Sequence, residues 1–271
     1  MTQITQMNTN KKYLWRYCII NKKKDNKMKK VLTIILLTIV MLNGQTPSAE
    51  TILKKIDENM ISKNQIMTSS MIIHGRRVSR TIRSKSWSIG DTKNFTEYLS
   101  PAREKGTKML KLDDKLWIYT PSTDRIIKIS GHMLRQSVMG SDLSYEDMME
   151  SSDLTDSYDA KVIGSEEIDG KQCWIINLVG KTDDLVYHQR KIWVDMKLYV
   201  PLREELFAKS GKLLKRMELK NIVNIDSRWY PTKMIFKDVL KNGEGTEFVI
   251  DEIKFDQNIP KYKFSKAGLK R

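Results

Sequence analysis

Three acidic side chains, Asp142, Glu146 and Asp147, are the residues of this sequence that come nearest to a catalytic group. Paired carboxylates can act as general acid and general base, but only when a nucleophile or a substrate is held between them. Ser144 stands three positions before Asp147, and this spacing is typical of a capping box at the start of a helix. We therefore expect the cluster to fix a helix start, and we assign no catalytic residue.

The other reactive residue types are scattered along the chain. His74, His132 and His188 have no second His or Glu at the spacing of metal ligands, so the sequence predicts no metal site. Cys173 lies in an alternating segment, which favours a small buried side chain over a nucleophile. The sequence also has no Gly-x-Ser-x-Gly elbow and no phosphate-binding loop. We expect a protein that is not an enzyme and that uses no cofactor.

The segment from Gly131 to Ser152, here called the cover segment, is unusually rich in methionine. Its methionines are Met133, Met139, Met148 and Met149. Methionine is flexible and polarizable, so it suits a surface that adapts to variable apolar partners, and it equally suits an irregular core. The composition leaves both a lid over a groove and a core filler open.

The remaining chain is mostly strand-like. Ile52 to Met60 has apolar residues at helical spacing, with Pro47 at a first helical position and Glu50 in the first turn. After this helix, short segments with period-two patterning predict strands. They are Phe95–Leu99, Thr107–Leu112, Lys115–Thr120, Arg125–Ile129, Gln172–Val179, Leu185–Val194, Leu202–Ala208, Leu213–Val223, Thr232–Leu240 and Thr246–Phe255.

Turn residues between these strands predict how they pair. Residues 121–124 (Pro-Ser-Thr-Asp), 210–211 (Ser-Gly) and 242–243 (Asn-Gly) each separate two strand-like segments, as antiparallel hairpins require. Several strands alternate apolar and polar residues, so one side of the sheet should be apolar and the other wet. The residues expected on apolar faces are Trp174, Ile176 and Leu178 in one strand and Leu213, Met217, Leu219 and Val223 in another.

The N-terminal region has the pattern of a secretory signal peptide. Met28-Lys29-Lys30 precede the apolar run Val31–Leu42, and small and turn-forming residues follow up to Ala49. A bilayer span needs roughly 20 apolar residues, more than this run has, which favours a signal peptide. An uncleaved N-terminal anchor is the alternative. We predict a signal peptide over 28–49, a wrongly assigned start or disordered extension over 1–27, and a single domain over 50–271 outside the cytoplasm.

The charge of that domain excludes a nucleic-acid footprint. Residues 1–49 hold nine Lys/Arg and one acidic residue, so +7 of the formal +15 remains from Glu50 onward. This balance is too moderate for nucleic-acid binding. It suits contact with anionic lipid headgroups, and it equally suits ordinary solubility.

Two parts of the sequence resemble the LolA-like family of outer-membrane lipoprotein-sorting proteins. The first is Lys115–Pro121, followed by Arg125, and the second is Met139–Met148 (MGSDLSYEDM). The upstream Leu99-Ser100-Pro101 with Gly106 also fits that pattern. The residues that carry the signature are Pro121, Gly140, Ser141, Asp142 and Asp147.

The resemblance implies a mainly β fold of the α+β type: a curved antiparallel sheet forms a half-barrel, and a few helices cover its concave apolar face. It implies a periplasmic, monomeric carrier of lipid or lipoprotein acyl chains, with an inner-membrane transporter as donor, an outer-membrane acceptor and no nucleic-acid partner. A lipid-sensing regulatory module and a lipid-modifying enzyme are the alternatives. Which sheet face is concave stays open. The residues expected in the groove or lid are Trp117, Tyr119, Met133, Leu134, Val138, Met139, Leu143, Tyr145, Met148, Met149 and Trp174.

Overall fold

The computed structural model describes residues 46–75, 77–150 and 154–271. The predicted extension over 1–27 and the apolar run of the predicted signal peptide lie outside these residues. Ser48–Arg271 forms one compact unit, and the description below concerns this unit alone. None of the helices in the described part of the chain has the length and apolar character needed to span a bilayer.

The unit is built on a sheet of thirteen antiparallel strands. Their order across the sheet is β6-β5-β4-β3-β2-β1-β13-β12-β11-β10-β9-β8-β7, so the last strand of the chain joins the first at the centre. The first half of the sheet contains β1 (Asn64–Ile73), β2 (Arg80–Ile89), β3 (Lys93–Ser100), β4 (Lys108–Leu112), β5 (Lys115–Thr120) and β6 (Arg125–Ile129). The second half contains β7 (Tyr158–Ile168), β8 (Lys171–Gly180), β9 (Gln189–Asp195), β10 (Pro201–Phe207), β11 (Leu213–Ile225), β12 (Arg228–Asp238) and β13 (Thr246–Phe255).

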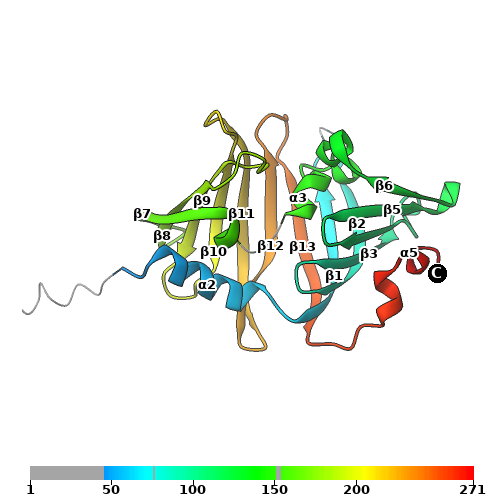
Figure 1. The fold of residues 1–271 in the computed structure, drawn as a ribbon, viewed down its shortest axis with the longest axis horizontal. Coiled ribbons are helices and arrows are strands. Elements are labelled where there is room, and N and C mark those ends of the chain that lie inside the picture. The colour runs from blue at the N-terminus through cyan, green and yellow to red at the C-terminus, as the bar shows by residue number, and fades with distance from the viewer. Residues whose placement is uncertain (1–45, 76, 151–153) are drawn as a thin grey trace, which may run out of the picture. The chain divides into compact units, whose positions relative to one another are not determined.

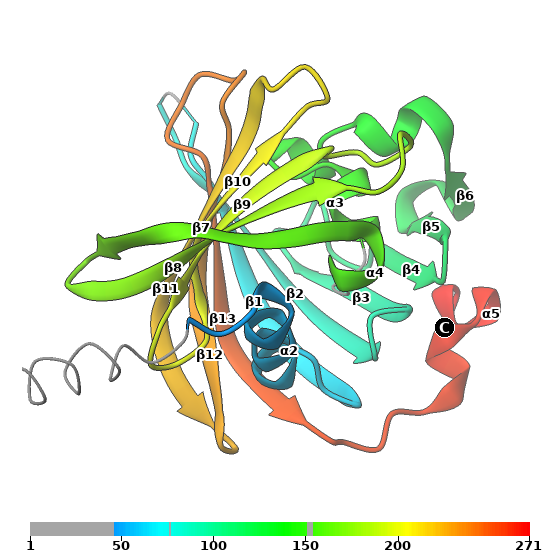
Figure 2. The same cartoon turned by 60° about the vertical axis from the view of Figure 1, so that its left-hand side comes forward.

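The sheet is curved and open, and helices lie in its hollow (Figure 1, Figure 2). The helical elements are short. They are α2 (Ala49–Met60), α3 (Tyr145–Met149), α4 (Leu154–Ser157), α5 (Lys266–Leu269), and the 3-10 turns η1 (Pro121–Thr123), η2 (Gly131–Arg135), η3 (Val138–Gly140) and η4 (Lys261–Phe264). This is the mainly β half-barrel that the sequence predicts.

The helix α2 packs on the concave face of the second half. Ser48 is its N-cap, and the Ser48 hydroxyl accepts a hydrogen bond from the Thr51 amide at 3.2 Å. Pro47 therefore precedes the cap and is not the first helical residue. Ile52 and Leu53 are buried against strands β8 and β9. The strand residues of this cluster are Trp174, Ile176, Leu178, Ile192 and Val194.

The predicted hairpins are confirmed by the strand pairing. β5 pairs with β6, β10 with β11 and β12 with β13, each antiparallel, across the three turns predicted from Pro, Gly and Asn. β5, β6 and β13 begin and end at the predicted residues. β1, β2 and β7 are strands that the sequence patterning did not predict.

The predicted apolar face of β11 is shorter than expected. Leu219 is buried, but Val223 is exposed. Between them, Asn221 has a φ of 53°, which is not a strand conformation, so the regular alternation of the strand ends there. The prediction that Val223 belongs to the apolar face was therefore wrong.

A second apolar layer lies on the other side of the first half of the sheet. Here the C-terminal segment, with η4 and α5, packs on the outward-facing side chains of β2 to β5. Leu269 is fully buried in this layer, and the Lys263 ammonium lies 3.6 Å from the centre of the Trp87 ring. The buried residues of this layer are Trp87, Phe95, Leu110, Trp117, Ile259 and Leu269.

Candidate functional site: a cavity under the cover segment

A cavity of about 440 Å³ opens on the concave face of β1 to β5. Its volume lies within the range of roughly 300–1,000 Å³ that is usual for small-molecule sites. The end of α2 contributes Met60, and the cover segment contributes Val138, Leu143 and Met148. The cavity is thus enclosed by the sheet, one helix end and the cover segment.

Strand register shows that the floor of the cavity is apolar at one end and polar at the other. Along β1, residues 65, 67, 69 and 71 point to the same face, and each pairs with a β2 residue that also lies on that face. At one end, Met71 pairs with Phe248 and Ile82, which makes an apolar row. At the other end the paired residues form a polar row, which runs Gln65, Ser88, Asn94 and Lys111 across four strands.

Hydroxyl side chains share the middle of the floor with Met67 and Met109. Ser69 and Ser84 share a hydrogen bond of 3.1 Å. In the adjoining rows, Asn94 Nδ2 donates to Ser88 Oγ at 2.7 Å, and Thr96 Oγ1 donates to Asn94 Oδ1 at 2.8 Å. The cavity is therefore amphipathic, whereas the sequence predicts an apolar groove.

The cover segment packs on the apolar part of the same face. Met133, Leu134, Met139, Tyr145 and Met149 lie against the buried cluster but do not line the cavity. Val138, Leu143 and Met148 do line it. The buried strand residues beneath the segment are Met71, Ile82, Tyr98, Met109, Leu116, Ile118 and Ile129. The segment serves as cavity wall at some positions and as core at others.

The turn into α3 follows the sequence signature. Gly140 has a φ of 76°, a conformation that favours glycine. Ser144 is the N-cap of α3: its hydroxyl accepts from the Asp147 amide at 3.2 Å, and the Asp147 carboxylate accepts from the Ser144 amide at 2.6 Å. The predicted capping box is confirmed.

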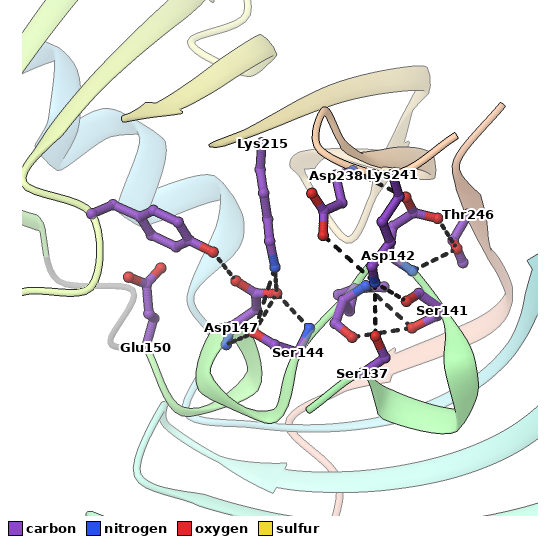
Figure 3. Close-up of polar contacts among 12 residues, drawn as sticks. Ser137, Ser141, Asp142, Ser144, Asp147, Glu150, Lys215, Asp238, Lys241 and Thr246 are labelled. Carbon is purple, nitrogen blue, oxygen red and sulfur yellow. Dashed lines mark hydrogen bonds and ion pairs between the residues drawn. The ribbon is translucent and has the colours of Figure 1, made fainter. Parts of the chain in front are cut away.

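Asp142 ties the cover segment to the β12–β13 hairpin (Figure 3). Its carboxylate accepts from the Asp238 amide at 3.0 Å and from the Thr246 hydroxyl at 2.8 Å. Lys241, in the same hairpin, donates to the Ser137 hydroxyl at 2.7 Å and to the Ser141 carbonyl at 3.0 Å. Asp142 is buried, so these contacts explain why a carboxylate is tolerated there.

Asp147 ties α3 to the second half of the sheet. Its carboxylate accepts hydrogen bonds from the Lys215 ammonium and from the Tyr187 hydroxyl (Figure 3 shows the Lys215 contact). Burial raises the pKa of Asp147, but Lys215, Ser144 and Tyr187 outweigh burial and hold the pKa below its ordinary value. The carboxylate is therefore ionised at neutral pH and acts as an anchor.

Glu150, which lines the cavity, continues this set of anchors. It accepts a hydrogen bond from Arg190 on β9, and Arg190 also donates to Glu204 at 3.0 Å. Burial lowers the pKa of Arg190, but the carboxylates of Glu204 and Glu150 outweigh it and raise that pKa. The guanidinium stays charged and joins the end of the cover segment to β9 and β10.

Lys111 holds the same end of the segment from the first half of the sheet. Its ammonium donates to the backbone carbonyls of Met149 at 3.2 Å and Glu150 at 3.4 Å. Burial lowers the pKa of Lys111. The cover segment is thus fixed on both sides of the cavity, by β4 on one side and by β9, β11 and β12 on the other.

The structure separates the predicted site residues into three groups. The cover-segment residues lie together on the concave face, as described. Trp117 and Tyr119 lie on the opposite face, under the C-terminal segment, and Trp174 packs beneath α2. Alternation in β5 places Leu116 and Ile118, not the two aromatic residues, toward the cover segment. The grouping of Trp117, Tyr119 and Trp174 with the lid was therefore wrong.

Sequence reasoning missed the polar floor and the basic anchors. Ser84, Ser86 and Ser88 alternate along β2, and this period-two pattern of hydroxyls was the available signal. Arg190 and Lys215 left no signal, since their acidic partners lie 40 and 68 residues away.

Cys173 is buried, and burial raises the pKa of its thiol to about 11, so it is not a thiolate at neutral pH. Within the described ranges, no group of three or more His, Cys, Asp or Glu could hold a metal ion.

Known proteins with this fold come from several bacteria. A DUF1329 family protein from Desulfovibrio piger is 25% identical, with a TM-score of 0.72 over 83% of this chain and 100% of that one. A LolA superfamily protein from Nitrosomonas europaea is 25% identical, with a TM-score of 0.69 over 82% and 99%. A putative outer membrane lipoprotein-sorting protein domain from Vibrio parahaemolyticus, at 24% identity, has a TM-score of 0.69 over 82% and 100%.

A comparison with family models assigns most of the chain to one family. No curated protein matches the chain. A family model described as an uncharacterized protein matches residues 90–271, which include the cover segment, the signature and most of the sheet. The chain therefore belongs to that family, and its half-barrel fold is similar to the folds of the DUF1329 family protein, the LolA superfamily protein and the lipoprotein-sorting protein domain.

Proposed function

We propose that this protein is a periplasmic carrier that holds the acyl chain of a lipid or lipoprotein in the cavity and delivers it toward the outer membrane. One observation carries the proposal: a cavity of about 440 Å³ has an apolar wall made by Met71, Phe248 and the cover-segment residues Leu143 and Met148. The proposal is supported by the names of the structural neighbours, which include a lipoprotein-sorting protein domain.

The apolar wall supplies the free energy of binding. Each methylene that leaves water contributes roughly 0.8 kcal/mol, so a long chain gains several kcal/mol even after the cost of ordering it. The hydroxyl-lined floor contributes little to this gain. The chain should therefore lie against the wall formed by Leu143 and Met148.

The contacts that hold the cover segment in place should slow the loading and release of a ligand. Lys111 and Arg190 hold its end from opposite sides of the cavity, and breaking a buried charged contact is costly. A ligand enclosed by such a segment leaves slowly unless another molecule lowers the cost of opening. We therefore include a donor at the inner membrane and an acceptor at the outer membrane in the proposal.

The experiment that tests this function is ligand extraction followed by rebinding. Organic extraction of the purified protein and mass spectrometry should identify a lipid with at least one long acyl chain. The delipidated, folded protein should then bind a fluorescent acyl-chain probe with a neutral head group, and an excess of unlabelled acyl lipid or acylated peptide should displace it. Folded protein that carries no lipid and binds no acyl probe would exclude the carrier function.

A further inference from the structure

The cavity floor changes from apolar to polar along the strands, and this direction distinguishes the two ends of a bound amphiphile. Gln65 and Met71 lie on the same face of β1, six residues apart, which corresponds to about 20 Å of extended strand. The apolar end at Met71 and Phe248 lies beside the cover segment. The polar end at Gln65, Ser88 and Asn94 adjoins the exposed β2–β3 turn at Gly90.

The polar end is rich in neutral hydrogen-bonding groups. The side-chain carbonyl oxygen of Gln65 is buried and has no hydrogen-bond partner among the described residues. A buried acceptor without a partner costs free energy, so a donor from a ligand would relieve that cost. Ser86 and Ser88 add hydroxyl groups to the lining on the neighbouring strand. A hydroxyl can both donate to Gln65 and accept from serine.

The charges around the cavity do not favour an anion. Among the residues that the structure describes, the charged side chains of the lining are Lys93, Lys111, Asp91 and Glu150, so their formal charges cancel. Lys111 also donates to two backbone carbonyls of the cover segment. An anionic head group would therefore find no surplus of positive charge.

We propose, resting on the carrier function above, that the cargo is an amphiphile with a neutral, hydroxyl-bearing head group. The head lies at the Gln65–Ser88–Asn94 end, and the acyl chain runs along β1 toward Met71 and the cover segment. A glyceride and a glycolipid share this head-group chemistry. Fatty acids and lysophosphatidic acid are anionic and are poor ligands.

The test compares four ligands with one C16 chain: a monoacylglycerol, an alkyl glucoside, a fatty acid and a lysophosphatidic acid. Competition against a neutral fluorescent monoacylglycerol on the full-length protein should rank both neutral ligands at least about tenfold tighter than both anionic ones. The glyceride and the glucoside arms then show which source of hydroxyl groups is preferred.

Two floor variants locate the head group. Gln65→Leu and Ser86→Ala each should weaken neutral ligands by roughly 2- to 12-fold, the effect of one net hydrogen bond, and leave a C16 hydrocarbon probe unaffected. Ser70→Ala is the matched control. Ser70 lies on β1, as Gln65 does, but its side chain points to the opposite face of the sheet and its hydroxyl donates a hydrogen bond to Asp251. Circular dichroism confirms that each variant is folded.

The two proposals fail in different ways. If no acyl ligand binds the folded protein, the carrier function is wrong. If acyl ligands bind but the anionic ones bind as tightly as the neutral ones, the head-group assignment is overturned while the carrier function stands. Equal loss of hydrocarbon and neutral-ligand affinity in the floor variants would also overturn it.

Discussion

Asp147 takes part in both the local and the long-range structure of the cover segment. It completes the capping box of α3 with Ser144, and it accepts hydrogen bonds from Lys215 on β11 and from Tyr187. Sequence spacing places Asp147 in a possible catalytic cluster. In the structure, its carboxylate is bound by Ser144, Lys215 and Tyr187 and serves as a structural anchor. The same is true of Asp142, which binds the β12–β13 hairpin.

The anchor at Asp147 predicts a pH dependence. Its folded-state pKa is below the ordinary value of about 3.9, so its contribution is fully present above pH 4 and is lost as pH falls through the lower, folded-state pKa. Asp147→Asn should lower the free energy of unfolding by about 1.5–3 kcal/mol at pH 7. Urea unfolding should show the difference from wild type shrinking below pH 4. A difference that stays constant down to pH 2 would contradict the ionised anchor.

The cap at Ser144 gives a second residue-scale prediction. Ser144→Ala removes the acceptor for the Asp147 amide and should cost about 0.5–2 kcal/mol of stability. Ser130→Ala is the control, because Ser130 precedes η2 without a side-chain capping bond and should cost close to nothing. Thermal unfolding of both variants measures the two losses of stability. Equal losses would show that the capping hydrogen bond at Ser144 does not stabilise the protein.

At the level of the element, the cover segment is neither a simple lid nor a simple filler of the core. Met148 lines the cavity and packs on the buried cluster beneath, whereas its neighbour Met149 packs on that cluster without lining the cavity. Met149 therefore fits the core-filler alternative, and the lid alternative stays a prediction that concerns Met148. The segment is also tied by charged contacts to both halves of the sheet, which a freely moving flap would lack.

Replacing the two methionines separately measures these two roles. Met148 lines the cavity and also packs on the buried cluster, so Met148→Ser should raise the off-rate of an acyl probe several-fold and lower the Tm of the ligand-free protein. Met149→Ser should lower the Tm and leave the off-rate nearly unchanged. Stopped-flow release and calorimetry on both variants test this. If both variants change the off-rate and the Tm to the same extent, Met148 and Met149 do not have different roles.

The C-terminal segment supports the opposite face of the sheet. Leu269 is fully buried there, so Leu269→Ala should cost about 2–5 kcal/mol of stability. Ligand affinity, measured with the acyl probe on the folded fraction, should not change, because the cavity lies on the concave face. Tryptophan fluorescence should report the loosening, since Trp87 and Trp117 belong to the same layer. A large fall in affinity would show that the two faces are coupled.

On the scale of the whole molecule, the sheet forms one continuous antiparallel surface whose first and last strands meet at the centre. This arrangement needs residues from both ends of the compact unit, since β1 pairs with β13 through nine residue pairs. A fragment spanning 48–271 should therefore fold alone and give a far-UV circular dichroism spectrum dominated by strand.

The exact start of that fragment matters. A fragment that begins at Glu50 lacks the Ser48 cap and the buried Ala49, so it should be less stable than the fragment from Ser48 by at least about 0.5 kcal/mol. Chemical unfolding of the two fragments measures this difference. A helix-dominated spectrum for either fragment would contradict the half-barrel.

Local signals in the sequence determined much of this protein. The hairpins at residues 121–124, 210–211 and 242–243 follow from turn residues, and the capping box at Ser144 follows from a three-residue spacing. These features depend on interactions between near neighbours, which a sequence pattern contains. The family signature added the half-barrel architecture.

Tertiary structure alone decided which face became the cavity and what its floor is made of. β1 and β2 were missed because their concave-facing residues include Ser69, Ser84 and Ser88, so the usual apolar alternation is absent. Trp117 was placed on the wrong face because alternation separates two faces of a strand but does not say which one curves inward. Arg190 and Lys215 reach partners far away in the sequence, and only the folding of the sheet around the cover segment brings those charges together.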